Sequence, residues 1–494
     1  MLLLPILIAL GVILAIRLLK TPNLSIPGPF IGRFTNLWYL WQMKRGDFHK
    51  TNIQLHERNG PVVRIAPNYF SLSDPAAAKA IYGHGSKYAK SEWYDAWTFS
   101  PDPKITNLFS ERNGQRHAGM RRKVAAMYSM TSLVAYEPFV DNCVGIFKER
   151  LEEFASEGTV IDVAHWVQCY AFDVIGEITF GKRFGFLDRG EDIRDVMAFL
   201  DLSFTVSSYS GLYIWLRPYF LRLAKAMGKN QTYVNQFTYK HVMEAKKAHQ
   251  ENKEKQSASN LPEFMVMKLI ELQDKQSNDA AAMMDWDVMS TAGANVGAGS
   301  DTTAISLSSV LYYMYKTPGC LEKVRKEIEE SRMPEKPTFK DAQAMVYLQA
   351  VIKEALRIHP GVGFPLFRTV PQGGAMLSGR YFPEGTNVGV NSWVVQYDTE
   401  VYGPDAAIFR PERWLESDKE RLTAMEQNFM PFGMGSRTCI GKNISLLEMS
   451  KLIPVLVRDF DMEFSDDIKA SIGVKNRWFV KPTNFQARMI KRTV

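Results

Sequence analysis

The chain has 494 residues, a formal net charge of +7 and 46% hydrophobic residues, the composition of a large globular protein. Its four cysteines are far apart and form no CxxC pair, so a disulfide framework is not expected: Cys143, Cys169, Cys320 and Cys439. The basic excess is mild and no dense Lys/Arg block is present, which argues against a nucleic-acid partner. An acidic protein partner or an anionic membrane surface explains the charge better.

The N-terminus has the character of a membrane anchor. Residues 1–16 are uncharged and almost wholly apolar, and Arg17 and Lys20 follow. The apolar stretch is roughly 28 Å long as a helix, at about 1.5 Å per residue, which nearly spans a bilayer core. A cleaved signal peptide is the alternative, but it carries its positive charge before the apolar run and ends in small residues. We therefore predict a retained transmembrane helix over residues 1–20, with the rest of the chain on the cytoplasmic side.

A connector and a short β region come next. Residues 21–45 include the stiff sequence SIPGP and are interpreted as a proline-rich hinge and lead-in. Alternating residues at 61–66 and 69–72 predict two strands around a Pro-Asn turn. Asp74, directly before a proline, has the chemistry of a helix N-cap.

Most of the remaining chain has helical periodicity. The amphipathic patterns predict helices at about 116–155, 165–180, 192–225, 231–250, 284–316 and 318–332. The polar stretch Gln250–Asn260 predicts an exposed loop, and residues 379–390 predict a hairpin around Pro-Glu-Gly. No internal repeat or second linker is evident, so residues 46–494 are assigned to one domain.

The sequence AGSDTT at residues 298–303 interrupts the longest apolar helix pattern. A glycine inside a helix costs about 1 kcal/mol relative to alanine, and a threonine hydroxyl can bond the preceding turn. One interpretation is a helix that crosses a reactive centre, where Gly299 leaves room for dioxygen and Asp301 and Thr302 supply protons. The other is a close helix–helix contact through small residues.

An ion pair is expected further on. Glu354 and Arg357 are three residues apart on one helix face, and the flanking residues are apolar, which indicates a largely buried helix. An exposed pair of this kind is worth under about 1 kcal/mol. Arg413, in the sequence FRPERW at residues 409–414, supplies another arginine.

The strongest motif is FGMGSRTCIG at residues 432–441, in which Cys439 stands in a glycine-bracketed loop two residues after Arg437. Glycines allow a backbone to fold closely round a sulfur and approach a flat ligand. Backbone N–H groups of such a loop can tune a metal-bound thiolate, and an arginine can neutralise a carboxylate of the ligand. The alternative is an inert buried cysteine, the usual state of a free Cys.

This loop resembles the haem-ligand signature of the cytochrome P-450 superfamily at every fixed position, and the other motifs stand in the family's order over residues 25–494. The resemblance implies a mainly α fold with a small β lobe near the N-terminus. It also implies haem b with Cys439 as its iron ligand. Thr302 and Asp301 are the implied catalytic residues, and Glu354, Arg357 and Arg413 the implied structural ionic cluster. The remaining cofactor-binding residues that it implies are His117, Arg121, Arg368, Phe432, Arg437 and Gly441.

His117 and Arg121 each have a feature that departs from the family pattern or allows another interpretation. Many family members have tryptophan where His117 stands, although histidine can also donate to a haem propionate. A solvated basic face is the alternative for Arg121, because two more basic residues follow it.

The implied activity is insertion of one oxygen atom from O2 into a lipophilic small molecule, with NADPH electrons from a separate flavoprotein reductase. No Rossmann fingerprint is present in this chain to bind a flavin. The stretch around residues 107–130 is similar to filamentous-fungal, pisatin demethylase-like members, which implies secondary metabolism, for example of terpenoids, or detoxification. Aromatic clusters at 93–99 and 204–220 fit a lipophilic ligand, although core packing or a membrane-dipping face explains any single residue better.

The expected location is the endoplasmic reticulum membrane, single-pass, with a cytosolic catalytic domain. Two alternatives remain: a haem-thiolate isomerase or dehydratase that uses no O2, and a non-catalytic haem-binding protein. An intact Asp301–Thr302 pair counts against the isomerase, because such enzymes often lose the threonine.

Overall fold

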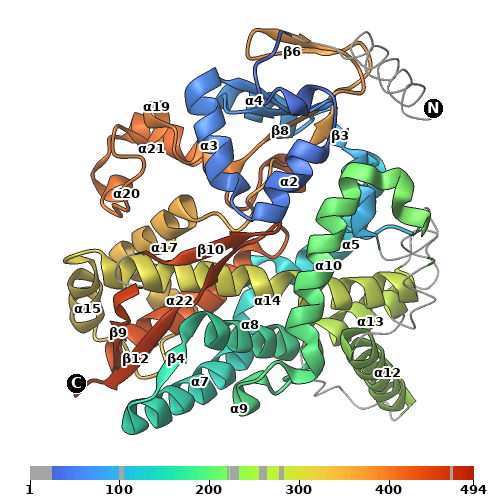
Figure 1. The fold of residues 1–494 in the computed structure, drawn as a ribbon. Helices are drawn as coiled ribbons and strands as arrows, with labels where there is room; N and C mark the ends of the chain where they lie inside the picture. The colour runs from blue at the N-terminus through green and yellow to red at the C-terminus, as the bar shows by residue number, and fades with distance from the viewer. Residues whose placement is uncertain are drawn as a thin grey trace, which may run out of the picture.

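The computed structural model describes residues 25–98, 105–219, 222, 233–254, 264–276, 283–467 and 471–493. Helices make up most of it, and a smaller β-rich lobe near the N-terminus lies on one side (Figure 1). The longer helices are α2 (Leu37–Arg45), α3 (Phe48–Asn59), α4 (Pro75–Tyr82), α5 (Gly114–Val124), α7 (Glu137–Glu157), α8 (Val163–Phe180), α10 (Val196–Ser210), α12 (Tyr233–Glu254), α13 (Met265–Lys275), α14 (Asp285–Lys316), α15 (Cys320–Glu330), α17 (Val346–Ile358), α21 (Lys419–Gln427) and α22 (Lys442–Asp459).

Shorter helices connect these elements: η1 (Ile31–Arg33), η2 (Glu92–Trp97), η3 (Ala125–Tyr128), α6 (Met130–Val134), α9 (Phe186–Arg189), η4 (Ile193–Asp195), η5 (Gly211–Leu216), α16 (Phe339–Ala344), α18 (Ser392–Val395), α19 (Thr399–Tyr402), α20 (Arg413–Glu416) and η6 (Gly435–Arg437). The strands are β1 (Val62–Ala66), β2 (Tyr69–Leu72), β3 (Ala89–Lys90), β4 (Val160–Asp162), β5 (Arg368–Thr369), β6 (Ala375–Leu377), β7 (Arg380–Phe382), β8 (Asn387–Val390), β9 (Phe460–Phe464), β10 (Gly473–Asn476), β11 (Val480–Thr483) and β12 (Gln486–Lys491).

The β lobe is built on a five-stranded sheet of order β1-β2-β8-β5-β3. The predicted antiparallel pair β1–β2 is confirmed. Asp74 caps α4 as expected, since its carboxylate accepts a hydrogen bond from the N–H of Ala76 at 2.8 Å. β3 pairs with β5, which places Lys90 directly opposite Arg368.

The predicted hairpin over residues 379–390 is wrong. β7 pairs with β6, whereas β8 pairs in parallel with β2 and antiparallel with β5. All four residues of β8 are buried, while Arg380 and Tyr381 of β7 are exposed. The alternating pattern therefore covers one largely exposed strand and one buried strand. Packing of β8 in the core beside β2 is more favourable than a local hairpin between β7 and β8.

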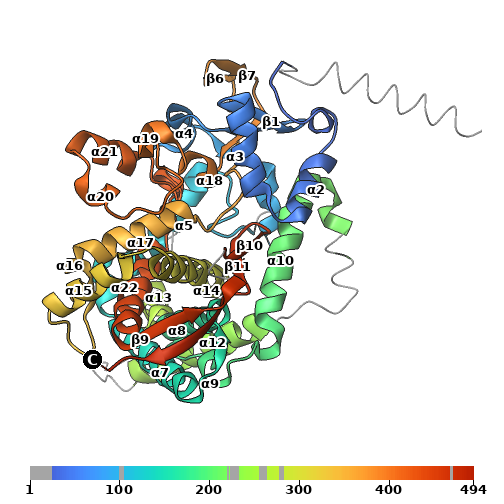
Figure 2. The same ribbon diagram turned by 60° about the vertical axis from the view of Figure 1, so that its left-hand side comes forward.

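The helical region surrounds α14, which crosses the middle of the molecule and packs against α8, α17 and α22 (Figures 1 and 2). Its bounds match the predicted helix at 284–316 within one residue. The predicted helix at 116–155 is instead broken into α5, η3, α6 and α7. Ser129 caps α6, because its hydroxyl accepts from the N–H of Ser132 at 3.3 Å, and a proline stands in the first turn of α7.

Two further boundaries differ from the sequence analysis. α10 stops at Ser210 and gives way to η5, within which Tyr213 leaves the helical region with φ −134° and ψ 53°. α12 continues to Glu254, so the start of the predicted loop is helical, and the remainder of that loop lies outside the described residues.

The predicted anchor over residues 1–20 also lies outside the described residues. No helix within the described part has the length and apolarity that a membrane span requires.

Glu354, Arg357 and Arg413 form a fully buried cluster, as predicted. The Glu354 carboxylate accepts from Arg357 at 2.8 Å and from Arg413 at 2.8 Å. The Trp414 indole N–H donates to its other oxygen at 2.9 Å. The arginines also donate to the backbone carbonyls of Gln396, Tyr402 and Ile408, so the cluster fixes the segment that leads towards Cys439 against α17.

Candidate active site

The loop that carries Cys439 is held by its own backbone. The N–H of Cys439 donates to the Phe432 carbonyl at 2.8 Å, which closes the loop before α22 begins. Gly435 has a φ of 61°, and a Cβ there would stand 1.9 Å from the Tyr82 carbonyl oxygen. Only glycine fits that position, which explains one of the motif's fixed residues. Gly441 is the residue before α22, and its Cβ position is 4.0 Å from the Cys439 sulfur.

The Cys439 side chain faces an internal space. The residue has substantial accessible surface, unlike the buried Cys143, Cys169 and Cys320. Burial is nevertheless the main cause that raises the pKa of its thiol, partly offset by the N–H groups of Gly441 and Lys442 and by the charge of Arg121. Surface accessible to solvent deep within the protein indicates a cavity beside the sulfur.

α14 presents a second accessible surface in the same region. Ala294 and Ala298 are exposed and Thr302 is partly exposed, although α14 is the central helix. These residues are four apart and so share one face. The hydroxyl of Thr303 donates to the hydroxyl of Ser445 at 3.3 Å, which ties α14 to the first turn of α22. This bond brings the turn of α14 that contains Thr302 close to the start of α22, which directly follows the Cys439 loop.

The expectation that Gly299 leaves room for dioxygen is wrong in this structure. A Cβ on Gly299 would lie 3.1 Å from the Ile175 side chain of α8. Gly299 thus permits close packing of α14 on α8, which was the alternative interpretation. Ala298, one residue earlier, is the small side chain on the accessible face.

Asp301 and Thr302 are placed differently. The Thr302 hydroxyl donates to the Ala298 carbonyl one turn earlier, at 2.7 Å. The Asp301 carboxylate is buried and accepts from the Gln168 amide of α8 at 2.5 Å. Its other oxygen lies 2.8 Å from the ammonium of Lys481 on β11.

Three basic residues lie together at the β-lobe side of this region: Lys90, Arg368 and Arg437. In the described part of the chain none of the three has an ion pair, and each donates only to neutral oxygens such as the carbonyls of Phe109, Phe367 and Glu111. Burial, with Arg368 and Arg437 next, lowers the pKa of Lys90 well below its usual value. Burial likewise lowers the pKa of Arg437 to about 10. Like charges opposite one another across a strand pair are destabilising, so a bound anion would stabilise this arrangement.

His117 and Arg121 of α5 complete the set. His117 is buried, and burial, followed by the charge of Arg437, lowers its pKa to about 3. It is therefore neutral at pH 7 and offers one ring N–H as a donor. Arg121 donates to the Thr438 carbonyl at 2.8 Å, directly beside Cys439. Phe432 lies at the start of the loop with the Lys442 ammonium 5.8 Å from its ring.

Aromatic side chains pack together between η2, α10 and the β10–β11 turn. Trp97 is 5.7 Å from Phe204 and 5.1 Å from Trp478, measured between ring centroids. Trp93, Trp97 and Trp478 are buried, so their role is core packing. Phe109 packs on this cluster but remains 41% exposed, so it borders open space.

These features fit a flat, anionic group with an iron at its centre. An accessible sulfur and an accessible small-residue face of α14 are both present. Cations that lack an anion stand at the edge, where carboxylates of the group would neutralise them. The site thus has the parts of a haem pocket, and the described residues contain no competing cluster of three metal-ligating side chains.

Comparison with known proteins agrees with this geometry. The cytochrome P450 family model matches residues 27–487. Pisatin demethylase of Fusarium vanettenii is 39% identical over 466 residues, which cover 93% of this chain and 88% of that protein. Cytochrome P450 monooxygenase cicH of Emericella nidulans is 36% identical over 475 residues, 94% of this chain and 93% of its own. Cytochrome P450 monooxygenase gsfF of Penicillium aethiopicum is 34% identical over 485 residues, 95% and 94% of the two chains.

The chain belongs to the cytochrome P450 family, whose members are monooxygenases that use a thiolate-ligated haem b. The predicted mainly α fold with a small β lobe, the enzyme class and the cofactor are confirmed.

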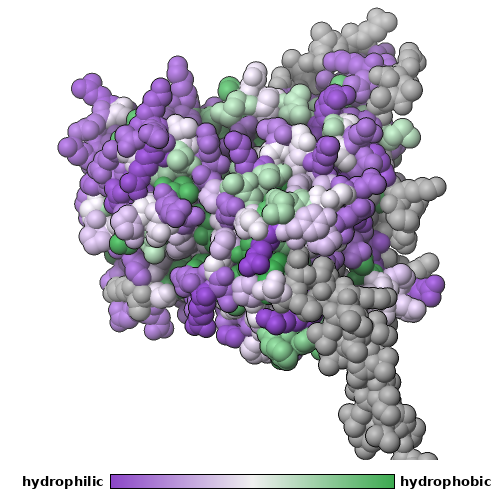
Figure 3. Space-filling model, turned by 90° about the horizontal axis from the view of Figure 1, so that it is seen from above, coloured by the Kyte–Doolittle hydropathy of each residue, from purple (hydrophilic) through white to green (hydrophobic). Residues whose placement is uncertain are grey.

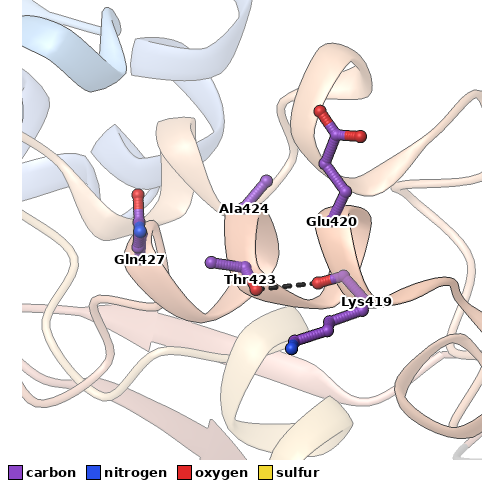
Figure 4. Close-up of a pocket in the computed structure, with 5 residues that line it drawn as sticks. All are labelled: Lys419, Glu420, Thr423, Ala424 and Gln427. Atoms are coloured by element: carbon purple, nitrogen blue, oxygen red, sulfur yellow. Dashed lines mark hydrogen bonds between the residues drawn. The ribbon is translucent and has the colours of Figure 1, made fainter.

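Sequence reasoning missed two charged residues of the site. Lys90 and Lys481 stand in short strands with no motif around them, and only the tertiary structure brings them to Arg368 and Asp301. A hollow elsewhere, on α21, is lined by one helix alone and contains none of the site residues (Figure 4): Lys419, Glu420, Thr423, Ala424 and Gln427.

Proposed function

We propose that Cys439 ligates the haem iron of a fungal-type monooxygenase that oxidises a lipophilic small molecule. The observation that carries this proposal is the accessible Cys439 sulfur in a loop that leads directly into α22, whose first turn is hydrogen-bonded to Thr303 of α14. Arg437, Arg368 and His117 hold the propionates, with Arg121 supporting the loop, while Phe432 and Gly441 shape the loop around the sulfur. The bound haem supplies the oxygen-activating chemistry.

Thr302 and Asp301 are the proposed proton-handling residues. The Thr302 hydroxyl is on the accessible face and can donate a proton at Oγ1 while it accepts another from water. Asp301 is one residue away but buried, so it acts through a change in its hydrogen bonding. This placement supports the monooxygenase over the isomerase or dehydratase, since those reactions need no proton delivery to oxygen.

Electrons are proposed to come from NADPH through a separate flavoprotein reductase. The segment around Cys439 and α5 presents exposed basic side chains, among them Arg122 and Lys442. A basic surface beside the thiolate suits an acidic redox partner, because opposite potentials speed encounter and fix orientation.

The substrate is proposed to be a secondary metabolite or a defence compound. The relatives named above, pisatin demethylase among them, support this proposal. Exposed Phe109 and the surrounding aromatic rings favour a lipophilic ligand.

We also propose that the enzyme is anchored in the endoplasmic reticulum membrane by residues 1–20, with its catalytic domain in the cytosol. Exposed apolar side chains near the N-terminal end support this: Phe30, Ile31, Leu37 and Trp41. Asn36 of this region donates to the Leu212 carbonyl at 2.8 Å, which brings exposed Trp215 of η5 close by. The view from above in Figure 3 shows hydrophobic patches among hydrophilic surface.

Deleting residues 1–20 should weaken membrane association, and protease should digest the catalytic domain in sealed microsomes. Full protection would place that domain in the lumen.

One experiment separates the proposed function from its alternatives. Deleting the gene in its host and comparing metabolites identifies the accumulating substrate. That compound, purified enzyme, reductase and NADPH should then give a product that carries one atom from labelled O2. A product formed without O2 and NADPH would identify an isomerase or dehydratase, and NADPH use no higher than without the enzyme would identify a haem-binding protein.

A further inference from the structure

The Asp301 carboxylate is held by groups from two elements other than α14. The Gln168 amide of α8 donates to one oxygen at 2.5 Å, and the Lys481 ammonium of β11 lies 2.8 Å from the other. The Asp301 side chain is fully buried, whereas that of Lys481 is 24% exposed. Lys481 is therefore a partly exposed residue whose ammonium pairs with a buried carboxylate.

Lys481 has a second carboxylate partner on a different helix. Asp201 of α10 lies 3.3 Å from the same ammonium. Arg477, in the turn of the β10–β11 hairpin, lies 3.3 Å from the other oxygen of Asp201. The hairpin is next to α10 in Figure 2, and β11 packs against α14. One ammonium thus connects α14 to α10.

The charges around Lys481 favour this double pairing. Burial alone would lower the pKa of Lys481, but Asp301 and then Asp201 outweigh it and raise the pKa. Polar contacts hold α10 in the same place: the Trp93 indole donates to the Ser208 carbonyl at 3.0 Å, and the Ser208 hydroxyl donates to the Arg477 carbonyl at 3.4 Å.

We propose that Lys481 is a positioning residue that holds the Asp301 carboxylate away from the accessible face of α14 and ties it to Asp201 of α10. When α10 moves away, Lys481 loses one of its two carboxylates, and the environment of Asp301 changes with it. The position of α10 is therefore coupled to Asp301, the residue next to Thr302. Any effect of this coupling on catalysis rests on the proposed role of Asp301, whereas the ion pairs between Lys481 and the two carboxylates do not depend on that role.

The α10 side of the tie is tested by hydrogen–deuterium exchange on the substrate-free holoenzyme. Lys481→Met and Asp201→Asn should each raise exchange of the α10 amides by about two- to five-fold, the factor that a partly exposed ion pair supplies. Lys481→Arg should keep the protection. Lys475→Met is the matched control, because Lys475 is an exposed residue of the same hairpin. Unchanged α10 exchange in Lys481→Met, or an equal rise in Lys475→Met, would overturn the proposal.

The Asp301 side is tested by unfolding midpoints of the same holoenzyme. Lys481→Met should lower the midpoint, because it leaves a buried carboxylate without its cation. Adding Asp301→Asn to that variant should raise the midpoint again, since the unpaired charge is gone. A further drop equal to that of Asp301→Asn alone would show that the two residues do not interact. Neither experiment measures turnover, so both can be interpreted even if Asp301 has no catalytic role. If the role holds, Lys481→Met should also increase the share of NADPH electrons lost to peroxide, and Lys481→Arg should restore coupling.

Discussion

Asp301 and Thr302 are consecutive residues of α14, yet their side chains leave the helix in different directions. Thr302 is partly exposed on the same face as the exposed Ala294 and Ala298, whereas Asp301 is fully buried beside Gln168 and Lys481. Only Thr302 is therefore in a position to contact a ligand on that face directly. Asp301 has to act through a rearrangement of the groups that hold it.

Thr302→Ala should retain haem but divert NADPH electrons to peroxide. Within the described residues the hydroxyl donates only to the Ala298 carbonyl of its own helix, so its loss should not unfold the protein. Removal of an oriented proton donor commonly costs about 10²–10⁴-fold where acid catalysis matters. The ratio of product to NADPH, with peroxide measured alongside, checks this. Thr303→Ser is the control, because Ser keeps the hydroxyl that donates to Ser445. Normal coupling in Thr302→Ala would remove Thr302 from the mechanism.

Lys90→Met should have opposite effects with and without haem. In the apoprotein it removes a buried cation that stands opposite Arg368, so the unfolding midpoint should rise. In the holoenzyme it removes a charge that the propionates neutralise, so haem should dissociate about 10–100-fold faster, as expected for one charge-assisted hydrogen bond. Arg122→Met, an exposed change on α5, should do neither. A change of the same sign in both forms would show that the cations do not serve the haem.

The motifs that could be predicted from sequence are those whose chemistry is local. The Cys439 loop, the Glu354–Arg357 pair and the α14 helix each carry their pattern within a few residues. Lys90 and Lys481 could not be predicted, because their partners are far away in sequence and joined only by the fold. The hairpin at 379–390 failed for the same reason, since β8 pairs with the distant β2.

Gly299 illustrates a different limit. Its sequence position allowed two interpretations, and the structure decides between them because Ile175 occupies the space beside it. Periodicity places a residue on a helix face but does not say which neighbour covers that face.

Glu354→Gln should destabilise the enzyme by roughly 3–5 kcal/mol, because it leaves the buried Arg357 without its counter-charge and removes one of the two carboxylates paired with Arg413. Chemical denaturation followed by tryptophan fluorescence measures the loss. Lys326→Met serves as the comparison, because it breaks the exposed 3.6 Å pair with Glu330 and should cost under roughly 0.5 kcal/mol. Similar losses in the two variants would contradict the structural role of the cluster.

Glu448 of α22 should make stability depend on pH. It is fully buried, neither carboxyl oxygen has a hydrogen-bond partner in the part of the chain described, and burial raises its pKa well above 4.5. The folded protein thus binds this proton more tightly than the unfolded chain does. Stability from this group is fully present below about pH 4.5 and falls as the pH rises towards the folded pKa, by up to about 1.4 kcal/mol per pH unit.

Glu448→Gln has nearly the same shape and cannot ionise. Its advantage in unfolding free energy over the natural protein should grow between pH 5 and pH 8. Parallel stability curves over that range would mean that Glu448 does not titrate abnormally.

The carbon-monoxide difference spectrum of the reduced enzyme tests the central claim most directly. Thiolate ligation by Cys439 predicts the red-shifted Soret band of a haem-thiolate protein. Cys439→Ala should abolish that band, while Cys143→Ser, Cys169→Ser and Cys320→Ser should keep it, since those three thiols are buried away from the site. A red-shifted band that persists in Cys439→Ala would contradict the account.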